Sequence, residues 1–140
     1  MELVQLCYVS CIDLTDLRFV SQFKNLMFRS KQFFNAKNIH GVSFYANEHF
    51  LHCFEGDKQE IEIIHQYILQ YSHQKYRFCF LHQIQNFHFQ TWQMKYVDQK
   101  SLVQLFCRKN GLLNFTPMHL TDQQIEELIE LICTQNTMYA

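Results

Sequence analysis

The fold is decided by one stretch of the chain, Ile39-His40-Gly41-Val42-Ser43-Phe44-Tyr45-Ala46-Asn47-Glu48-His49-Phe50-Leu51-His52-Cys53-Phe54-Glu55-Gly56. Its two halves are rich in β-branched and aromatic residues and flank a polar break at 46–49, which predicts a β-hairpin. In the second half, successive side chains alternate between two faces, and both faces are mainly apolar. A strand that is apolar on both faces needs cover on both, so this hairpin should lie in the middle of a sheet.

One polar side chain interrupts the apolar alternation. His52 shares a face with Phe50 and Phe54 in the second predicted strand. A polar group that points from a central strand beneath a covering helix is either hydrogen-bonded within the protein or in contact with a ligand. The sequence leaves both interpretations of His52 open.

The composition indicates one well-packed globular domain. The chain has 140 residues, of which 16% are aromatic, with three glycines and one proline, and it contains no linker. A formal net charge of −1 and the lack of a basic run argue against electrostatic binding to nucleic acid or to an anionic membrane. No apolar run is long enough to cross a bilayer, and the start Met1-Glu2-Leu3 is unlike a signal peptide, so we expect a cytoplasmic protein.

The eight histidines and six cysteines raise the question of metal binding. Because the spacings Cys-x-x-Cys and His-x-x-x-His do not occur, we expect no metal site. The cysteines fall mostly inside predicted elements and form no close pair, which predicts reduced, buried thiols. A glycine-rich phosphate loop, a nucleophile elbow and a helical pair of acidic ligands are also missing from the sequence, so nothing in it supports an enzyme.

Residue periodicity predicts further elements around the hairpin. They are a strand at 3–10, a helix from Thr15 or Asp16 to Phe34, a helix from Asp57 to Tyr71 that opens with capping-box spacing, and strands at 76–81 and 87–97. The resulting order is βαββαββ. Crossovers between neighbouring parallel strands share one hand, so both helices should cover one face of a five-stranded mixed sheet in an α+β fold.

The C-terminal segment is expected to cover the other face of the sheet. Asp98 is a candidate cap for a helix that ends at Asn110-Gly111. The run from Thr121 to Gln124 has capping-box spacing and precedes a helix with one apolar side. We therefore expect a sheet domain at 1–97 and a helical extension at 98–140 that packs on it.

Four short motifs together resemble the BLUF family of flavin-based blue-light sensors. Their order and spacing, without a gap from Ser30 to Met94, are more specific than any one motif alone. The resemblance covers the sheet domain and the two-helix extension common in short members, and it implies a ferredoxin-like fold. The motifs are Leu6-Cys7-Tyr8-Val9-Ser10, Ile39-x-Gly41, Phe50-Leu51-x-Cys53-Phe54-Glu55-Gly56 and Trp92-Gln93-Met94.

The resemblance implies that FAD lies between the first two helices, with its ring over the sheet. In the family, light drives electron and proton transfer from a tyrosine to the flavin, and a glutamine then rearranges its hydrogen bonds. The last strand and the C-terminal helices report this change, here to an unidentified protein partner or to a second copy of the chain. Tyr8 matches the tyrosine, and Trp92 and Met94 match the responding pair on the last strand. Lys31 falls where a basic residue often follows a serine late in the first helix.

Two positions depart from the family pattern. His52 occupies the glutamine slot, and a neutral imidazole offers one donor and one acceptor where an amide offers two donors and an acceptor that can exchange places. The family asparagine that holds the polar edge of the flavin falls at Phe34. Asn35 reaches that slot only through an insertion and a deletion within one helix. The candidate flavin-site residues are thus Tyr8, Lys31, Phe34, Asn35, His52, Trp92 and Met94, and we expect low FAD occupancy.

Two functional interpretations follow from this half-preserved site. The first is a BLUF-like blue-light sensor or signalling domain with a degenerate flavin site, which acts through protein–protein interaction. The alternative is a flavin-free interaction or regulatory module that no longer senses light. Tyr8 as a core tyrosine and His52 as a satisfied core histidine fit the alternative.

Overall fold

The computed structural model describes residues 2–12, 29–69 and 74–138. The first part of the predicted 15–34 helix and the end of the predicted 57–71 helix lie outside these residues, and 29–36 are helical. The elements are β1 (Leu3–Ile12), β2 (His40–Ala46), β3 (His49–Asp57), α2 (Lys58–Leu69), β4 (Gln74–Gln83), β5 (Trp92–Tyr96), α3 (Leu102–Lys109), a 3₁₀ turn η1 (Pro117–His119) and α4 (Asp122–Met138).

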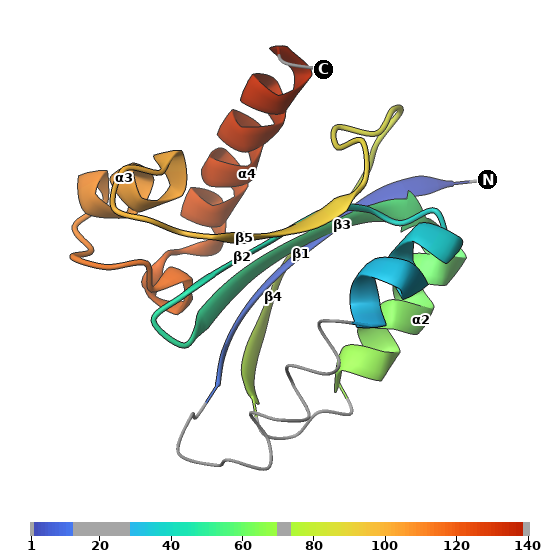
Figure 1. Cartoon of the computed structure of the whole chain (residues 1–140), viewed down its shortest axis with the longest axis horizontal. Coiled ribbons are helices and arrows are strands. Elements are labelled where there is room, and N and C mark those ends of the chain that lie inside the picture. The colour runs from blue at the N-terminus through green and yellow to red at the C-terminus, as the bar shows by residue number, and fades with distance from the viewer. Residues whose placement is uncertain (1, 13–28, 70–73, 139–140) are drawn as a thin grey trace.

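The strands form one five-stranded mixed sheet in the order β4-β1-β3-β2-β5. All neighbours pair antiparallel except β2 and β5, which are parallel. The helical residues 29–36 and α2 lie on one side of the sheet, and α3 and α4 lie on the other (Figure 1). This arrangement confirms the α+β, ferredoxin-like fold with helices on both faces.

The predicted hairpin is formed by β2 and β3 with a two-residue turn. Asn47 and Glu48 both have positive φ, 52° and 65°, which is the signature of a type I′ turn and matches the twist of the two strands. Ala46 pairs with His49 at the start of the ladder. The hairpin thereby sets the register in which Ser43 lies opposite His52.

The sheet separates two apolar clusters, as the two-faced apolar pattern of β3 predicts. On the α2 side, Phe54 packs with Leu6 and Ile61, and on the α4 side Leu51 and Cys53 pack with residues of that helix. Both clusters contain large side chains that are under 2% exposed, and burial of each such side chain contributes about 1.5–3 kcal/mol. The alternation along β3 therefore anchors both helical layers.

The two C-terminal helices begin with side-chain caps. Thr121 and Gln124 form the predicted capping box, since Thr121 Oγ1 accepts from the Gln124 amide at 3.1 Å and Gln124 Oε1 accepts from the Thr121 amide at 2.9 Å. The predicted cap at Asp98 is wrong. Ser101 caps α3, because its hydroxyl oxygen accepts a hydrogen bond from the Gln104 amide. The carboxylate of Asp98 instead accepts a hydrogen bond from the Lys100 amide, one turn before the helix begins.

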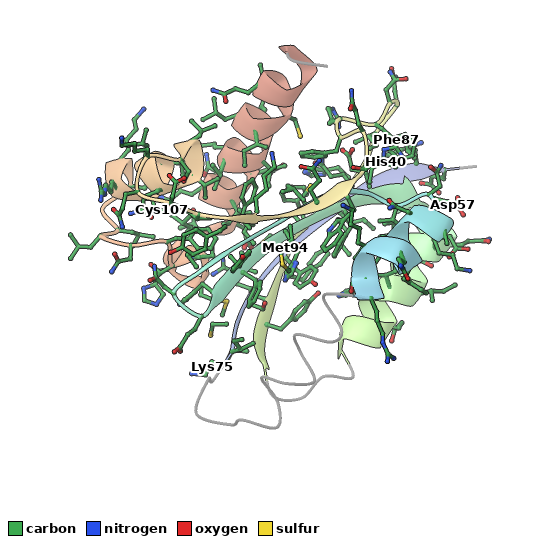
Figure 2. The ribbon with its side chains drawn as sticks, viewed as in Figure 1. His40, Asp57, Lys75, Phe87, Met94 and Cys107 are labelled. Atoms are coloured by element: carbon green, nitrogen blue, oxygen red, sulfur yellow. The ribbon has the colours of Figure 1, made fainter. Side chains whose placement is uncertain are left out.

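The last strand is shorter than the predicted 87–97 and comprises Trp92–Tyr96. The preceding segment leaves the sheet because its polar groups have other partners. The His88 amide donates to the side chain of Glu55 at 2.7 Å, and the ring of Phe87 stacks on His40 with 3.6 Å between centroids (Figure 2).

None of the six cysteines forms a disulfide; Cys7, Cys53, Cys107 and Cys133 are buried, as predicted, whereas Cys11 and Cys79 are partly buried. Among the described residues, the structure has no helix whose length and apolar character would let it span a membrane.

Candidate functional site

Tyr8 lies in the middle of β1 and faces the α2 side of the sheet, where it is 3% exposed. Its ring stacks on His52 with 4.4 Å between centroids and an interplanar angle of 20°. The ring of Tyr76, on the neighbouring strand β4, lies 5.0 Å away. Burial, together with the nearby Tyr76, raises the pKa of Tyr8 well above its ordinary value, so the phenol stays neutral.

His52 is buried directly opposite Ser43 in the β2–β3 ladder. Its Nδ1 lies 2.7 Å from Ser43 Oγ, and the same oxygen accepts a hydrogen bond of 3.2 Å from the indole N–H of Trp92. The Ser43 oxygen accepts from Trp92 and its hydroxyl proton remains free to donate, so we assign that proton to the His52 Nδ1 contact, with Nδ1 as the acceptor. Burial lowers the pKa of His52 to about 3. His52 is therefore a neutral imidazole with a hydrogen-bond partner inside the protein.

Phe34 projects from the helical residues 29–36 into the cluster beneath that helix. It is 7% exposed, and its ring lies 4.9 Å from that of Trp92 and 5.1 Å from that of Phe54. Asn35 and Lys31 are exposed on the same helical segment. The helix thus turns Phe34 toward the sheet and Asn35 away from it.

Trp92 and Met94 lie on the edge strand β5, beside β2. Trp92 is 2% exposed and is held between Phe34 and the Ser43 hydroxyl. Met94 is half-buried and packs against the clusters that contain Tyr8 and Phe50 (Figure 2). Tyr8, Phe34, His52, Trp92 and Met94 therefore gather on one face of the sheet, whereas Lys31 and Asn35 point to solvent.

Sequence reasoning did not single out Ser43, Tyr76 or His65, which complete this face. Ser43 links His52 to Trp92, and the Tyr76 hydroxyl is hydrogen-bonded to His65 Nε2 on α2. Ser43 was detectable in principle, because it is a polar residue in the middle of a mainly apolar strand and lies opposite His52 in the predicted hairpin. No pattern in the sequence predicts the hydrogen bond between Tyr76 and His65, because it joins a strand and a helix that are adjacent only in the folded chain.

The chain was compared with known protein families. A family model described as sensors of blue light using FAD matches residues 3–95. The chain belongs to the BLUF family. BLUF domains are blue-light sensing domains that bind flavin. A search of curated proteins found no match.

Solved structures share the fold of this BLUF chain. BlsA in its ground state is 23% identical with a TM-score of 0.78, and the match covers 94% of this chain and 87% of that one. Photo-activated BlsA is 23% identical with a TM-score of 0.76, covering 94% of both chains. The dark state of BlrB, a BLUF protein, is 22% identical with a TM-score of 0.70, covering 96% of this chain and 97% of that one.

Proposed function

We propose that this BLUF chain is a signalling domain with a degenerate flavin site, which holds FAD weakly and acts through protein–protein interaction. The observation that carries the proposal is the aromatic cluster on the α2 side of the sheet. Phe34 packs on Trp92 and Phe54, and His52 stacks on Tyr8. The residues present do not fit FAD as the family holds it, for two separate reasons.

The first reason is that Phe34 fills the asparagine slot. A phenyl ring cannot hydrogen-bond the polar edge of a flavin, and this ring is already buried against two other aromatic side chains. Loss of a hydrogen bond to a buried ligand group costs about 1–3 kcal/mol. That cost corresponds to a roughly tenfold to hundredfold loss of affinity for each contact.

The second reason is that His52 cannot replace the glutamine amide. Its Nδ1 is committed to Ser43, and its low pKa leaves it without a second proton near neutral pH. An imidazole carries its donor and acceptor on separate ring atoms, so rotation does not exchange them at one position as rotation of an amide does. The hydrogen-bond exchange on which the family's red shift depends therefore has no equivalent in His52.

The test is to restore both slots with the substitutions Phe34→Asn and His52→Gln. We expect each single variant to raise FAD affinity. The change in binding free energy of the double variant should differ from the sum of the two single changes, because both residues would contact one ring. On illumination, the FAD-supplied double variant should give a reversible red shift, and the unmodified protein should not. Absorption titration with FAD and difference spectra after illumination measure these effects.

Phe33→Asn is the matched control, because Phe33 adjoins Phe34 on the same helical segment but is 47% exposed. This control should leave FAD affinity unchanged. A reversible red shift in the unmodified protein would return it to the class of intact sensors. A double variant that still lacks FAD would show that more of the pocket has changed than these two positions.

The alternative function is a flavin-free module that no longer senses light. It is favoured by the fact that His52, Ser43 and Trp92 form a hydrogen-bonded chain within the protein. Failure of excess FAD to bind the unmodified protein at any concentration would select this alternative over weak binding.

Output through a protein partner is supported by the exposed apolar side chains of the C-terminal region. Leu113 is 86% exposed, Leu105 on α3 is 52% exposed, and Tyr96 on the edge strand β5 is 64% exposed. Large exposed apolar side chains of this kind favour contact with another protein. The six free cysteines suit a reducing compartment, and we place the protein in the cytoplasm.

A further inference from the structure

A row of polar side chains crosses the α4 side of the sheet, which is otherwise apolar. Gln5 on β1 pairs in register with Glu55 on β3 and with His82 on β4. Opposite this row, α4 contributes Glu126, whose Oε1 lies 2.5 Å from His82 Nε2, and Cys133, whose sulfur accepts from Gln5 Nε2 at 3.5 Å. Neither the flavin site nor the apolar packing of α4 accounts for this row.

Glu55 is the centre of the row and is fully buried, at 0% exposure. Its carboxylate accepts hydrogen bonds from Gln5 Nε2 at 2.8 Å and from the His88 amide at 2.7 Å, and it lies 2.6 Å from His88 Nδ1. Within the described part of the chain, the ion pair of Glu55 is with His88 and not with a lysine or an arginine. A buried carboxylate is stable only with strong compensation, which a cation supplies most directly.

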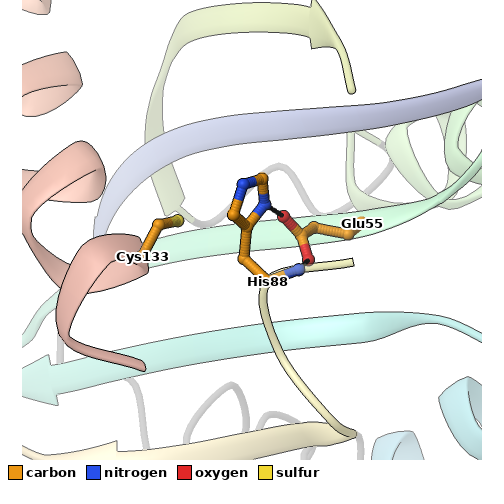
Figure 3. A group of neighbouring side chains, drawn as sticks. All are labelled: Glu55, His88 and Cys133. Carbon is orange, nitrogen blue, oxygen red and sulfur yellow. Dashed lines mark hydrogen bonds and ion pairs between the residues drawn. The ribbon is translucent and has the colours of Figure 1, made fainter. Parts of the chain in front are cut away.

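Cys133 completes a three-residue cluster with Glu55 and His88. One ligand atom from each residue, a carboxylate oxygen, an imidazole nitrogen and the thiol sulfur, lies within 4.8 Å of the other two. The three side chains come from β3, from the segment before β5 and from α4, and they point toward one another (Figure 3). Gln5 on β1 supports the cluster, because its side-chain amide donates hydrogen bonds both to Glu55 and to Cys133.

We propose that Glu55, His88 and Cys133 bind a divalent transition-metal ion of the zinc type and thereby tie α4 to the sheet. Oxygen, nitrogen and sulfur are the three ligand types that Zn²⁺ takes in proteins. Ligand atoms around tetrahedral Zn²⁺ lie about 3.3–3.8 Å apart, so the cluster reaches that geometry with shifts of about 1 Å. His88 lies outside regular secondary structure, which lets its segment absorb such a shift.

A fourth ligand has room beside the cluster. A cavity of ≈ 570 Å³ is lined by His88 and Cys133 together with Gln5, His82 and two glutamates of α4, Glu126 and Glu130. A water molecule from this cavity can occupy the open position that three protein ligands leave. On binding, the thiol proton of Cys133 passes to solvent, and His88 binds through Nδ1 as a neutral imidazole whose proton is on Nε2.

The proposed site differs from the expectation from sequence that the chain has no metal site. The three ligands are separated by 33 and 45 positions in the chain, so no local spacing motif predicts them. Only the packing of α4 on the sheet brings them together. The proposal is independent of the flavin site, which lies on the opposite face.

The test uses the full chain, stripped of metal with a chelator and titrated with Zn²⁺ by calorimetry and with Co²⁺ by absorption. We expect one ion per chain and a thiolate-to-cobalt charge-transfer band. His88→Gln and Cys133→Ser should each remove the band and weaken Zn²⁺ binding more than about a hundredfold, and Gln5→Leu should weaken it about 10–100-fold as a supporting partner. Zn²⁺ should also raise the unfolding temperature of the unmodified protein.

Two variants serve as matched controls. Cys107→Ala removes another buried thiol of the same apolar cluster, and His119→Gln removes an exposed imidazole, and both should keep the band and the affinity. If Cys133→Ser does not fold, His88→Gln decides the question, because His88 is half-buried on an irregular segment. The proposal is overturned if Co²⁺ gives no thiolate band with the unmodified protein, or if the band survives in His88→Gln.

Discussion

At the scale of single residues, the burial of His52 sets how folding depends on pH. Burial lowers the pKa of His52 to about 3 in the folded protein, whereas a histidine in an unfolded chain titrates near 6.5. Between these values the unfolded state binds a proton that the folded state does not. His52 therefore does not lower the free energy of unfolding above about pH 6.5, and it lowers this free energy progressively as the pH drops from 6.5 toward 3.

The substitution His52→Gln should remove this contribution. Between about pH 6 and pH 4, the free energy of unfolding of the variant should fall less steeply, by up to about 1.4 kcal/mol for each pH unit. Urea denaturation at a series of pH values measures the difference in slope. Equal slopes in His52→Gln and the unmodified protein would mean that His52 is not held neutral by burial.

Gly41 is a second residue whose identity the fold requires. Its φ is +138°, and a Cβ atom there would lie 2.0 Å from the carbonyl oxygen of Cys53 on the neighbouring strand. Gly41→Ala should therefore destabilise the protein by about 3 kcal/mol or more. Gly111→Ala is the control, because Gly111 has φ +87° but open space around it, and it should cost only about 1–2 kcal/mol. Thermal or urea unfolding that ranks the two variants in the opposite order would refute this account of the β2–β3 contact.

At the scale of elements, the start of α4 depends on the Thr121 capping box. Thr121→Ala removes the acceptor for the Gln124 amide and should lower the free energy of unfolding by about 1 kcal/mol. Thr134→Ala is the control within the same helix, since Thr134 Oγ1 donates to the Glu130 carbonyl and caps nothing, and its effect should stay within about 0.5 kcal/mol. Equal losses in the two variants would show that the box does not stabilise the helix start.

The elements that the sequence predicts well are those with local causes. The alternation in β3 and the spacing of the Thr121 box involve neighbouring residues, and both are present in the structure. The position of Phe34 on the inward side of its helix likewise follows from helical periodicity. Phe34 is buried and Asn35 is exposed.

The features that the sequence does not predict depend on partners far along the chain. The early part of the predicted last strand leaves the sheet because His88 bonds to Glu55, which lies 33 positions earlier. The wrong cap at Asp98 is the exception and has a local cause, because Ser101 competes for the helix start only three residues later. The cluster of Glu55, His88 and Cys133 joins three elements, and only the fold places them together.

At the scale of the whole molecule, the two faces of the sheet carry different chemistry. The α2 face holds Tyr8, His52 and Trp92 in an aromatic cluster, and the α4 face holds the polar row centred on Glu55. Both groups of side chains come from β1 and β3, because successive residues of these strands point to opposite faces of the sheet. Changes at Tyr8 and at Glu55 thus act on the same two strands from opposite sides.

The central claim is that the aromatic cluster on the α2 face has replaced a working flavin site. The most direct measurement is the FAD content of the purified full chain after gel filtration, read from its visible absorption spectrum. We predict a colourless protein, or one with much less than one FAD per chain, because Phe34 and His52 withhold the hydrogen bonds that would retain the cofactor. One tightly held FAD per chain would contradict this account and show that Asn35 or His52 holds the flavin after all.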